Sequence, residues 1–245
     1  MKTRQFGEDK YVGDPINAVK IFNEKSVDEL IVIDIDASKN GVEPDYKLIK
    51  KLADESRMPL CYGGGVMSVE QVQRIIQLGV EKVALSSALL EAPDLATRLS
   101  EVVGRQSVVA VLDVKKSFLK GYEVYIGNGK VKVKGGLLSW LDSLQTQGVG
   151  EFLINSIERD GMQGGYDLSL AKLVKQNVSV PVTFLGGASS LDDIGNLVET
   201  VGLVGCAAGS LFVFKGKYRA VLINYPSFDE KFKLITERLM KYEQS

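Results

Sequence analysis

The sequence contains no histidine among its 245 residues, and this absence removes several kinds of chemistry. A Ser-His-Asp triad, a Cys-His pair and a histidine metal site are all excluded. Any proton transfer must therefore be carried out by aspartate, glutamate, lysine, tyrosine or cysteine. Only two cysteines are present, Cys61 and Cys206, which are too few for a disulfide framework. We expect both to be small buried side chains.

Long apolar runs, basic runs and low-complexity stretches are also missing. No apolar segment approaches the roughly 18 residues of a membrane span, and the N-terminus lacks a signal-peptide core, so we expect a cytoplasmic protein without membrane contacts. With 30 basic and 31 acidic side chains, the formal net charge of −1 argues against binding to nucleic acid. No linker divides the chain, so residues 1–245 are expected to form a single domain.

What the sequence does contain is a series of short β-branched runs, each followed by a helical pattern. Seven runs are expected to be strands, at residues 30–36, 59–64, 82–87, 107–114, 151–158, 181–187 and 203–210. The helical patterns between them include 68–78 and 191–200. Strands that alternate with helices form a parallel sheet, and runs that are apolar throughout are buried on both faces. The sequence therefore predicts an α/β fold.

Two further segments carry local signals. Residues 122–134 alternate apolar and polar side chains around Asn128-Gly129, which predicts a surface hairpin after the fourth strand. Ser227 and Glu230 form the pattern of a capping box at the start of a C-terminal helix. Apolar residues then recur at helical spacing, and this stripe is expected to pack on the body of the protein: Phe228, Phe232, Ile235, Leu239 and Tyr242.

An internal repeat gives the most specific information about the fold. An offset of 122 positions relates Glu29 to Glu151, Gly64-Gly65 to Gly186-Gly187, and residues 84–90 to 206–212 without an insertion. Two such halves with four strands each would close a (β/α)₈ TIM barrel built from two half-barrel repeats. The run at 107–114 opens the second half, and its counterpart would fall before Met1. We therefore expect the first barrel strand to be missing from this chain.

Small residues end strands in both halves, at the face where barrel enzymes place their active sites. Glycines leave the backbone amides accessible to a ligand, and hydroxyl groups near the start of a helix can donate further hydrogen bonds. The set of small residues in each half is therefore a predicted phosphate site. The members are Gly64, Gly65, Ser86 and Ser87 in the first half, and Gly161, Gly186, Gly187, Gly209 and Ser210 in the second. Two sites related by a pseudo-twofold axis imply a bisphosphorylated ligand. The alternative is that these glycines serve only tight turns.

Carboxylates supply the candidate reactive groups at the same face. Asp113, Asp160, Asp34 and Asp36 follow or end strands, and a pair with pKa values tuned apart could transfer protons. For each of them, loop capping or an ion pair is the alternative interpretation. The spacing of Asp34 and Asp36 is common on solvated surfaces, so we expect no metal and no cofactor.

A second charged set opens strands at the opposite end. Glu29, Lys82 and Glu151 each begin a predicted strand, so they should ring the amino-terminal mouth of the barrel. From the residues alone, a stabilising ion cluster and a functional site are equally good interpretations.

With these residues in place, the sequence resembles the cyclase subunit of imidazole glycerol phosphate synthase. The resemblance covers nearly the whole chain and rests on GDP (13–15), DEL (28–30), YGGGV (62–66), KV (82–83), SVVAVLD (107–113), GE (150–151), NSIERDG (155–161), GGYD (164–167), LGGA (185–188) and AAGS (207–210). It implies a lyase of histidine biosynthesis. Such a subunit takes ammonia from a glutaminase docked at the amino-terminal face, and it cleaves and cyclises a bisphosphorylated ribulosyl aminoimidazole carboxamide intermediate to imidazole glycerol phosphate.

The resemblance also implies roles for individual residues. Asp113 matches one of two catalytic aspartates, Asp160 and Asp34 match active-site acids, and Lys2 matches a lysine of the first loop. Gly65, Ser86 and Ser87 match one phosphate site, and Gly187, Gly209 and Ser210 match the other. Glu29, Lys82 and Glu151 match three of the four residues of an ammonia gate.

Several departures keep a second function open. The other catalytic aspartate and the arginine of the gate belong to the first strand of the family, and Asn155 and Ser86 replace a typical Thr and Asn. The segments 11–19, 205–214 and 216–226 are more similar to a paralogous branch linked to bacterial surface-polysaccharide (O-antigen, lipopolysaccharide) synthesis. There, a cyclase-like barrel and a glutaminase feed ammonia to a sugar amidotransferase. The alternative is therefore a non-cyclising ammonia-delivery subunit.

Overall fold

The computed structural model describes residues 11–92, 94–118, 121–216 and 218–244 of the chain. Seven of its strands run parallel in one sheet, in the spatial order β1-β2-β3-β4-β7-β8-β9. Their bounds are β1 Leu30–Ile33, β2 Leu60–Gly63, β3 Lys82–Leu85, β4 Val108–Ser117, β7 Glu151–Ser156, β8 Val182–Leu185 and β9 Gly205–Cys206. The seven strands expected from the sequence are all confirmed.

Most strands end a few residues earlier than expected, for a local reason. Gly64 and Gly186 follow the last residues of β2 and β8 closely, and their φ angles are +108° and +101°. An extended strand requires negative φ, so the backbone leaves the sheet at these glycines.

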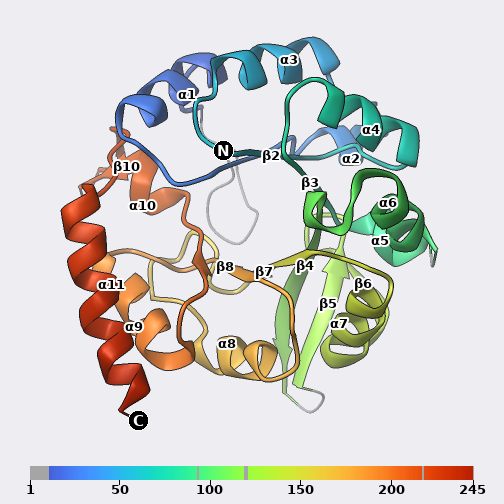
Figure 1. The fold of residues 1–245 in the computed structure, drawn as a ribbon. Helices are drawn as coiled ribbons and strands as arrows, with labels where there is room; N and C mark the ends of the chain where they lie inside the picture. The colour runs from blue at the N-terminus through green and yellow to red at the C-terminus, as the bar shows by residue number, and fades with distance from the viewer. Residues whose placement is uncertain (1–10, 93, 119–120, 217, 245) are drawn as a thin grey trace.

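The sheet curls on itself, and the helices form a ring around its outer side (Figure 1). This arrangement is a TIM-barrel-like α/β fold. Within the described ranges no strand pairs with the outer edge of β1 or of β9, so the curled sheet is open between them. In a closed eight-stranded barrel, one further strand would pair with both β1 and β9 at this opening.

The structure reproduces the internal repeat. The bounds of β2, Leu60–Gly63, and of β8, Val182–Leu185, differ by the offset of 122 positions. β3 and β9 also lie at equivalent places, each followed by a short helix, α5 (Ser87–Glu91) and α10 (Ser210–Val213). Residues that are 122 positions apart in the two halves therefore lie at equivalent places in their strands.

Several helices on the outer side begin at side chains that cap them. Ser68 and Ser190 each form a capping box with the residue three positions later, which satisfies backbone amides at the helix start. The remaining helices are α1 Pro15–Glu24, α2 Ala37–Asn40, α3 Tyr46–Glu55, α4 Val69–Gln77, α6 Leu95–Val103, α7 Leu137–Thr146, α8 Leu168–Lys175, α9 Leu191–Val201 and α11 Phe228–Glu243, with a 3₁₀ turn at Arg105–Ser107. No helix in the described segments is long and apolar enough to span a bilayer.

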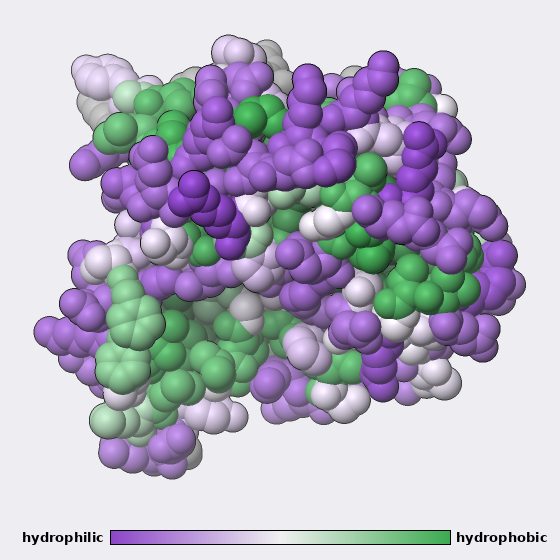
Figure 2. All heavy atoms as spheres, turned by 45° about the horizontal axis from the view of Figure 1, so that its top comes forward, coloured by the Kyte–Doolittle hydropathy of each residue, from purple (hydrophilic) through white to green (hydrophobic). Residues whose placement is uncertain are grey.

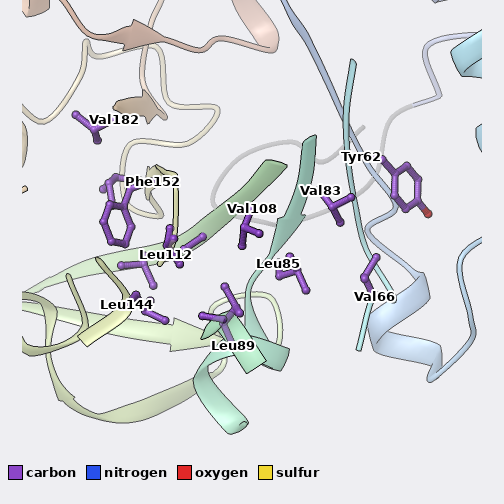
Figure 3. Close-up of a cluster of buried hydrophobic side chains, with 14 of the residues drawn as sticks. Tyr62, Val66, Val83, Leu85, Leu89, Val108, Leu112, Leu144, Phe152 and Val182 are labelled. Atoms are coloured by element: carbon purple, nitrogen blue, oxygen red, sulfur yellow. The ribbon is translucent and has the colours of Figure 1, made fainter. Parts of the chain in front are cut away.

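The main apolar core lies between the strands and these helices (Figure 3). Phe152 of β7 and Leu112 of β4 point to Leu144 of α7, and Leu85 of β3 lies beside Leu89 of α5. Phe152 is fully buried, and burial of one large apolar side chain contributes about 1.5–3 kcal/mol. This outer layer fixes the orientation of the strands and leaves their other face for the barrel interior.

The expected hairpin is confirmed as β5 (Gly121–Ile126) and β6 (Val131–Gly136). Asn128 and Gly129 lie in the turn with φ angles of +61° and +73°, as a tight hairpin turn requires. β5 pairs antiparallel with the end of β4, so the hairpin extends the sheet beyond Asp113, whose cross-strand neighbour is Tyr125. The hairpin therefore stands beside the candidate catalytic carboxylate.

The expectation for the C-terminal helix is only partly right. Its capping box is confirmed, since Ser227 Oγ accepts from the amide of Glu230 at 3.3 Å. Phe228 and Phe232, however, do not pack on the body: they are 73% and 62% exposed and stack on each other with ring centroids 5.9 Å apart. The helix contacts α9 through other side chains, because Gly195 and Gly202 of that region leave room for Arg238 and Tyr242. Figure 2 shows one face of the molecule, where apolar patches lie between polar side chains.

Tyr225, just before α11, links the two borders of the open sheet. Its hydroxyl group donates to Asp28 Oδ2 at 2.7 Å, close to the start of β1, and its ring contacts Phe212 of α10 at a centroid distance of 4.8 Å. Lys231 of α11 forms an ion pair with the same aspartate. These contacts hold the last helix against the first described strand.

Candidate functional site

The charged set at the amino ends of the strands forms one connected cluster. Lys82, the first residue of β3, places its Nζ 3.1 Å from a carboxylate oxygen of Glu29 and 2.8 Å from Oε2 of Glu151. Thr183 of β8 donates its hydroxyl proton to Oε1 of Glu151 at 2.7 Å. The sequence prediction that Glu29, Lys82 and Glu151 lie together is therefore correct, and Thr183 is a further member.

The environment of Lys82 keeps its amine protonated. Partial burial favours the neutral amine, but hydrogen bonds and charges from Glu151 and Glu29 outweigh it and raise the pKa of Lys82. The lysine side chain is 26% exposed, between Glu29 at 33% and Glu151 at 13%. A cation is thus held between two anions at the mouth of the barrel.

Directly above this cluster, the interior is apolar. Side chains alternate between the faces of a strand, so the residue two positions after each member points inward again. Two of these next positions, Ala84 and Leu153, form a separate buried cluster with Cys61 and Val109. Four further apolar residues pack against this cluster: Ile31, Val111, Leu185 and Ala207. Burial raises the pKa of the Cys61 thiol, which stays protonated, so this layer carries no charge. Cys61 is a small buried side chain, as expected; Cys206 is partly buried.

The interior ends at Asp113 and Asn155, which are cross-strand neighbours in β4 and β7. The side-chain amide of Asn155 donates to Oδ1 of Asp113 at 2.9 Å. Asn155 is 4% exposed, and its own Oδ1 has no hydrogen-bond partner among the residues that the structure describes. A buried acceptor without a donor is unusual in a folded protein.

The other predicted acids lie in the loops of this face. Asp34, just after β1, accepts hydrogen bonds at Oδ1 from the backbone amides of Asp36 and Ala37, both at 3.0 Å. Asp160 lies in the turn after β7, and its amide donates to the carbonyl oxygen of Ser156 at 2.9 Å. For Asp34 the structure thus shows a loop-capping contact. Lys2 lies outside the described residues.

Most glycines of the two predicted phosphate sites are required by the backbone, and Gly209, with a φ of −104°, is the exception. A Cβ atom on Gly64 would lie 2.2 Å from the carbonyl oxygen of Asp34, and one on Gly187 would lie 2.1 Å from that of Gly165. Gly65, Gly161, Gly186 and Gly187 all have positive φ. A structural reason for these glycines therefore exists beside any role in binding.

The small residues of the next strands lie at the starts of two short helices. Ser86 immediately precedes α5, which begins at Ser87, and its side chain makes no capping bond with that helix. Gly209 immediately precedes α10, which begins at Ser210. The two groups are thus brought to corresponding places in the two halves, as the repeat predicts.

Sequence reasoning missed the roles of Thr183 and Asn155 in these contacts. Thr183 lies 122 positions after Cys61, so the repeat marks it as an inward-facing position. Asn155 lies four positions after Glu151, on the same face of the same strand. No group of three or more acidic or cysteine side chains suited to a metal ion occurs in the described part of the chain.

Fold and site together define a class: a TIM-barrel-like protein of two repeats, with an ion cluster at one mouth and carboxylates at the other. Sequence comparison agrees with this class. A family model described as "Histidine biosynthesis protein" matches residues 1–219. The chain belongs to this family, the HisF family.

Several named relatives are similar along most of their length. The chain is 56% identical over 236 residues to the "Putative imidazole glycerol phosphate synthase subunit hisF3" of Vibrio vulnificus, covering 96% of this chain and 91% of that protein. It is 49% identical over 230 residues to a hisF2 protein with the same wording in its name from Pseudomonas aeruginosa, covering 94% and 92%. The "Imidazole glycerol phosphate synthase subunit HisF" of Streptococcus sanguinis is 35% identical over 201 residues, covering 82% and 80%.

Proposed function

We propose that this chain is a cyclase-type subunit of a glutamine-dependent imidazole glycerol phosphate synthase. It receives ammonia at the amino-terminal mouth and uses it at the opposite face to convert a bisphosphorylated ribulosyl aminoimidazole carboxamide to imidazole glycerol phosphate. The observation that carries this proposal is the position of Lys82 between Glu29 and Glu151, directly below an apolar interior that leads to Asp113. Relatives named as subunits of this synthase support it.

The charged cluster acts as the gate in this proposal. The amine of Lys82 contacts two carboxylates. Its side chain could therefore move and open the mouth while it keeps its ion pair with one of them. Above it, the layer around Ala84 and Leu153 is apolar. Such a layer admits a small neutral molecule at low cost, whereas transfer of an ion into it costs several kcal/mol or more.

The chemistry is assigned to the carboxylates at the other end. Asp113 would transfer protons during ring closure, and Asn155 would hold its carboxylate in place through the hydrogen bond at 2.9 Å. Asp160, Asp34 and Lys2 are proposed to contact the ligand from the surrounding loops. The glycine and serine groups of the two halves, which contain Gly65 and Gly187, would each hold one phosphate.

A glutaminase is the partner that this arrangement requires. Ammonia must enter where the cluster around Lys82 lies, so the glutaminase is expected to dock on the amino-terminal face of the barrel. Glu29 and Thr183 form part of that mouth. No cofactor or metal takes part in the proposed reaction.

Reconstitution tests the proposal. The chain, mixed with the glutaminase encoded by the same organism, should form imidazole glycerol phosphate from the ribulosyl bisphosphate with either glutamine or ammonium chloride as nitrogen source. Glu151→Gln weakens the hold on Lys82. It should therefore change turnover with glutamine more than turnover with ammonium chloride. Absence of product with both nitrogen sources would reject the cyclase.

A second function is favoured by one observation, the opening between β1 and β9 beside the candidate site. Asp113 belongs to β4, the middle strand of the curled sheet, and no strand of the described segments fills the opening between β1 and β9 to supply a second strand-borne carboxylate. The chain would then deliver ammonia to a sugar amidotransferase of surface-polysaccharide synthesis without closing a ring. In the same assay this subunit would stimulate the glutaminase but form no imidazole product with ammonium chloride.

A further inference from the structure

Thr183 is in direct contact with the charged cluster at the amino-terminal mouth. It lies in β8, opposite Leu153 of β7 in the parallel register. Its hydroxyl group donates to Oε1 of Glu151 at 2.7 Å, while Oε2 of the same carboxylate accepts from Nζ of Lys82 at 2.8 Å. The carboxylate is thus bound at both oxygens by donors from two different strands. It cannot turn without losing one of these hydrogen bonds, which are strong because the acceptor is charged.

The other carboxylate of the cluster has no such anchor. Among the residues that the structure describes, Lys82 is the only hydrogen-bond partner of the Glu29 side chain, at 3.1 Å. Glu29 is also the more exposed of the two side chains, at 33% against 13% for Glu151. It immediately precedes β1, which borders the opening of the sheet. The cluster therefore has one fixed carboxylate and one that is held by Lys82 alone.

The space for the Thr183 side chain comes from a glycine on the next strand. Gly205 of β9 is the register partner of Thr183. A Cβ atom on Gly205 would lie 2.0 Å from Oγ1 and 2.8 Å from Cβ of Thr183, far inside the roughly 3.5–4.0 Å of an ordinary contact. Gly205 is not among the glycines with positive φ, so its backbone conformation does not require a glycine. The missing side chain therefore leaves room for the hydroxyl group that reaches Glu151.

The two carboxylates differ in what the loss of Lys82 would cost them. When the Lys82 amine moves aside to let ammonia pass, it can keep one of its two partners. Glu151 is the less exposed carboxylate and is held by Thr183, so the loss of its cation would leave a largely buried charge uncompensated. Glu29 is closer to water and would be solvated instead. Separation of Lys82 from Glu29 is therefore the less costly movement.

We propose that Thr183 is a positioning residue of the gate: it anchors Glu151, so that Lys82 stays on this carboxylate and the mouth opens on the side of Glu29. The inference rests on the proposed function, in which ammonia enters at this mouth. Entry is then directed to the border of the sheet at β1. Lys82 returns to the same place after each passage, because one of its partners does not move.

The yield of product per glutamate released by the complex with the glutaminase tests the proposal. Thr183→Val removes the hydroxyl group and keeps the branched shape, so it should lower this yield about three- to tenfold, as expected for loss of a hydrogen bond to a charged group. Thr183→Ser keeps the hydroxyl group and should restore most of the yield. Glu29→Gln should lower the yield less than Thr183→Val. Thr97→Val, at an exposed position of α6, is the matched control and should behave like wild type.

A second measurement does not depend on turnover. Burial lowers the pKa of Lys82, but the contacts with Glu151 and Glu29 outweigh it and raise the pKa. An NMR titration of the lysine side chains in the isolated chain, with Lys82 assigned through Lys82→Arg, measures this pKa. Thr183→Val should lower it, because a Glu151 carboxylate without its anchor turns towards water, whereas Thr183→Ser should not. In a Glu151→Gln background, Thr183→Val should have no further effect.

A wild-type yield or an unchanged pKa of Lys82 in Thr183→Val would overturn the inference. A loss of yield in Thr183→Ser as large as in Thr183→Val would overturn it too, because the hydroxyl group would then not be the cause. If wild type forms no product with either glutamine or ammonium chloride, the proposed function fails, and the pKa of Lys82 alone decides whether Thr183 anchors Glu151. Thr183→Ala repeats both measurements if the valine variant folds poorly.

Discussion

Asn155 and Asp113 form a hydrogen-bonded pair across β7 and β4, with the amide nitrogen 2.9 Å from the carboxylate oxygen. The pair closes the upper end of the apolar interior. Since the amide of Asn155 donates to Oδ1, the orientation of the Asp113 carboxylate is fixed at the carboxyl-terminal end of the strand. Both residues arise from strands whose register places them side by side, so their geometry does not depend on a loop.

The first prediction concerns Asp113. Asp113→Asn should lower ammonia-dependent turnover of the ribulosyl bisphosphate by about 10²- to 10⁴-fold, because the group that transfers the proton is lost. Affinity for ribose 5-phosphate should stay within about twofold. Steady-state rates with ammonium chloride, together with calorimetric titration, check this. Asp142→Asn, an exposed aspartate on α7, is the control. Unchanged turnover in Asp113→Asn would remove this residue from the mechanism.

The second prediction concerns pH and Lys82. Folding raises the pKa of Lys82, so the stability from its ion pairs is complete below the ordinary value of 10.5 and is lost as the pH rises through the raised value. Lys82→Met should destabilise the protein by roughly 2 kcal/mol at neutral pH, because two carboxylates stay close without a cation. The difference from wild type should shrink in strongly alkaline solution. Denaturant unfolding between pH 7 and pH 11.5 measures it.

Lys82→Arg is the matched control for this experiment. Arginine keeps its charge throughout that range, so the loss of stability at alkaline pH should be smaller in this variant than in wild type. A constant difference between wild type and Lys82→Met at all pH values would contradict the role of the ion pairs.

The third prediction compares two glycines with positive φ. A Cβ atom on Gly187 would meet the carbonyl oxygen of Gly165 at 2.1 Å, whereas one on Gly41 would meet nothing within 4 Å. Gly187→Ala should therefore destabilise the protein by more than about 3 kcal/mol, and Gly41→Ala by about 1–2 kcal/mol, the cost of the left-handed conformation alone. Thermal and denaturant unfolding would show the order, and equal effects would indicate that the loop after β8 can move.

The strands and the charged cluster could be predicted from sequence because they depend on patterns within one strand or between repeats. The offset from Glu29 to Glu151 fixes both the strand and the place in it where each carboxylate lies. The position of Lys82 near these carboxylates can be predicted too, because it also begins a strand and the starts of parallel strands meet at one mouth of a barrel.

Other features depend on contacts that no local pattern encodes. Phe228 and Phe232 fit an apolar stripe, yet α11 turns a different side toward α9 because Arg238 forms ion pairs with Asp192 and Glu199 there. The hydrogen bond from Asn155 to Asp113 depends on the register between β4 and β7, and the hydroxyl of Thr183 finds Glu151 only because β7 and β8 are neighbours. Pairing between strands has to be seen in three dimensions.

The cluster at the amino-terminal mouth has a consequence for the form in which nitrogen could travel. The Lys82 amine and the carboxylates of Glu29 and Glu151 carry a combined charge of −1. An ammonium ion that arrives from solution would therefore be bound there by the two carboxylates. It could not continue as a cation, because the side chains of the next layer, such as Ala84 and Leu153, offer no counter-charge. The proton would have to stay behind, so the mouth would sort the two forms of the same molecule by their charge.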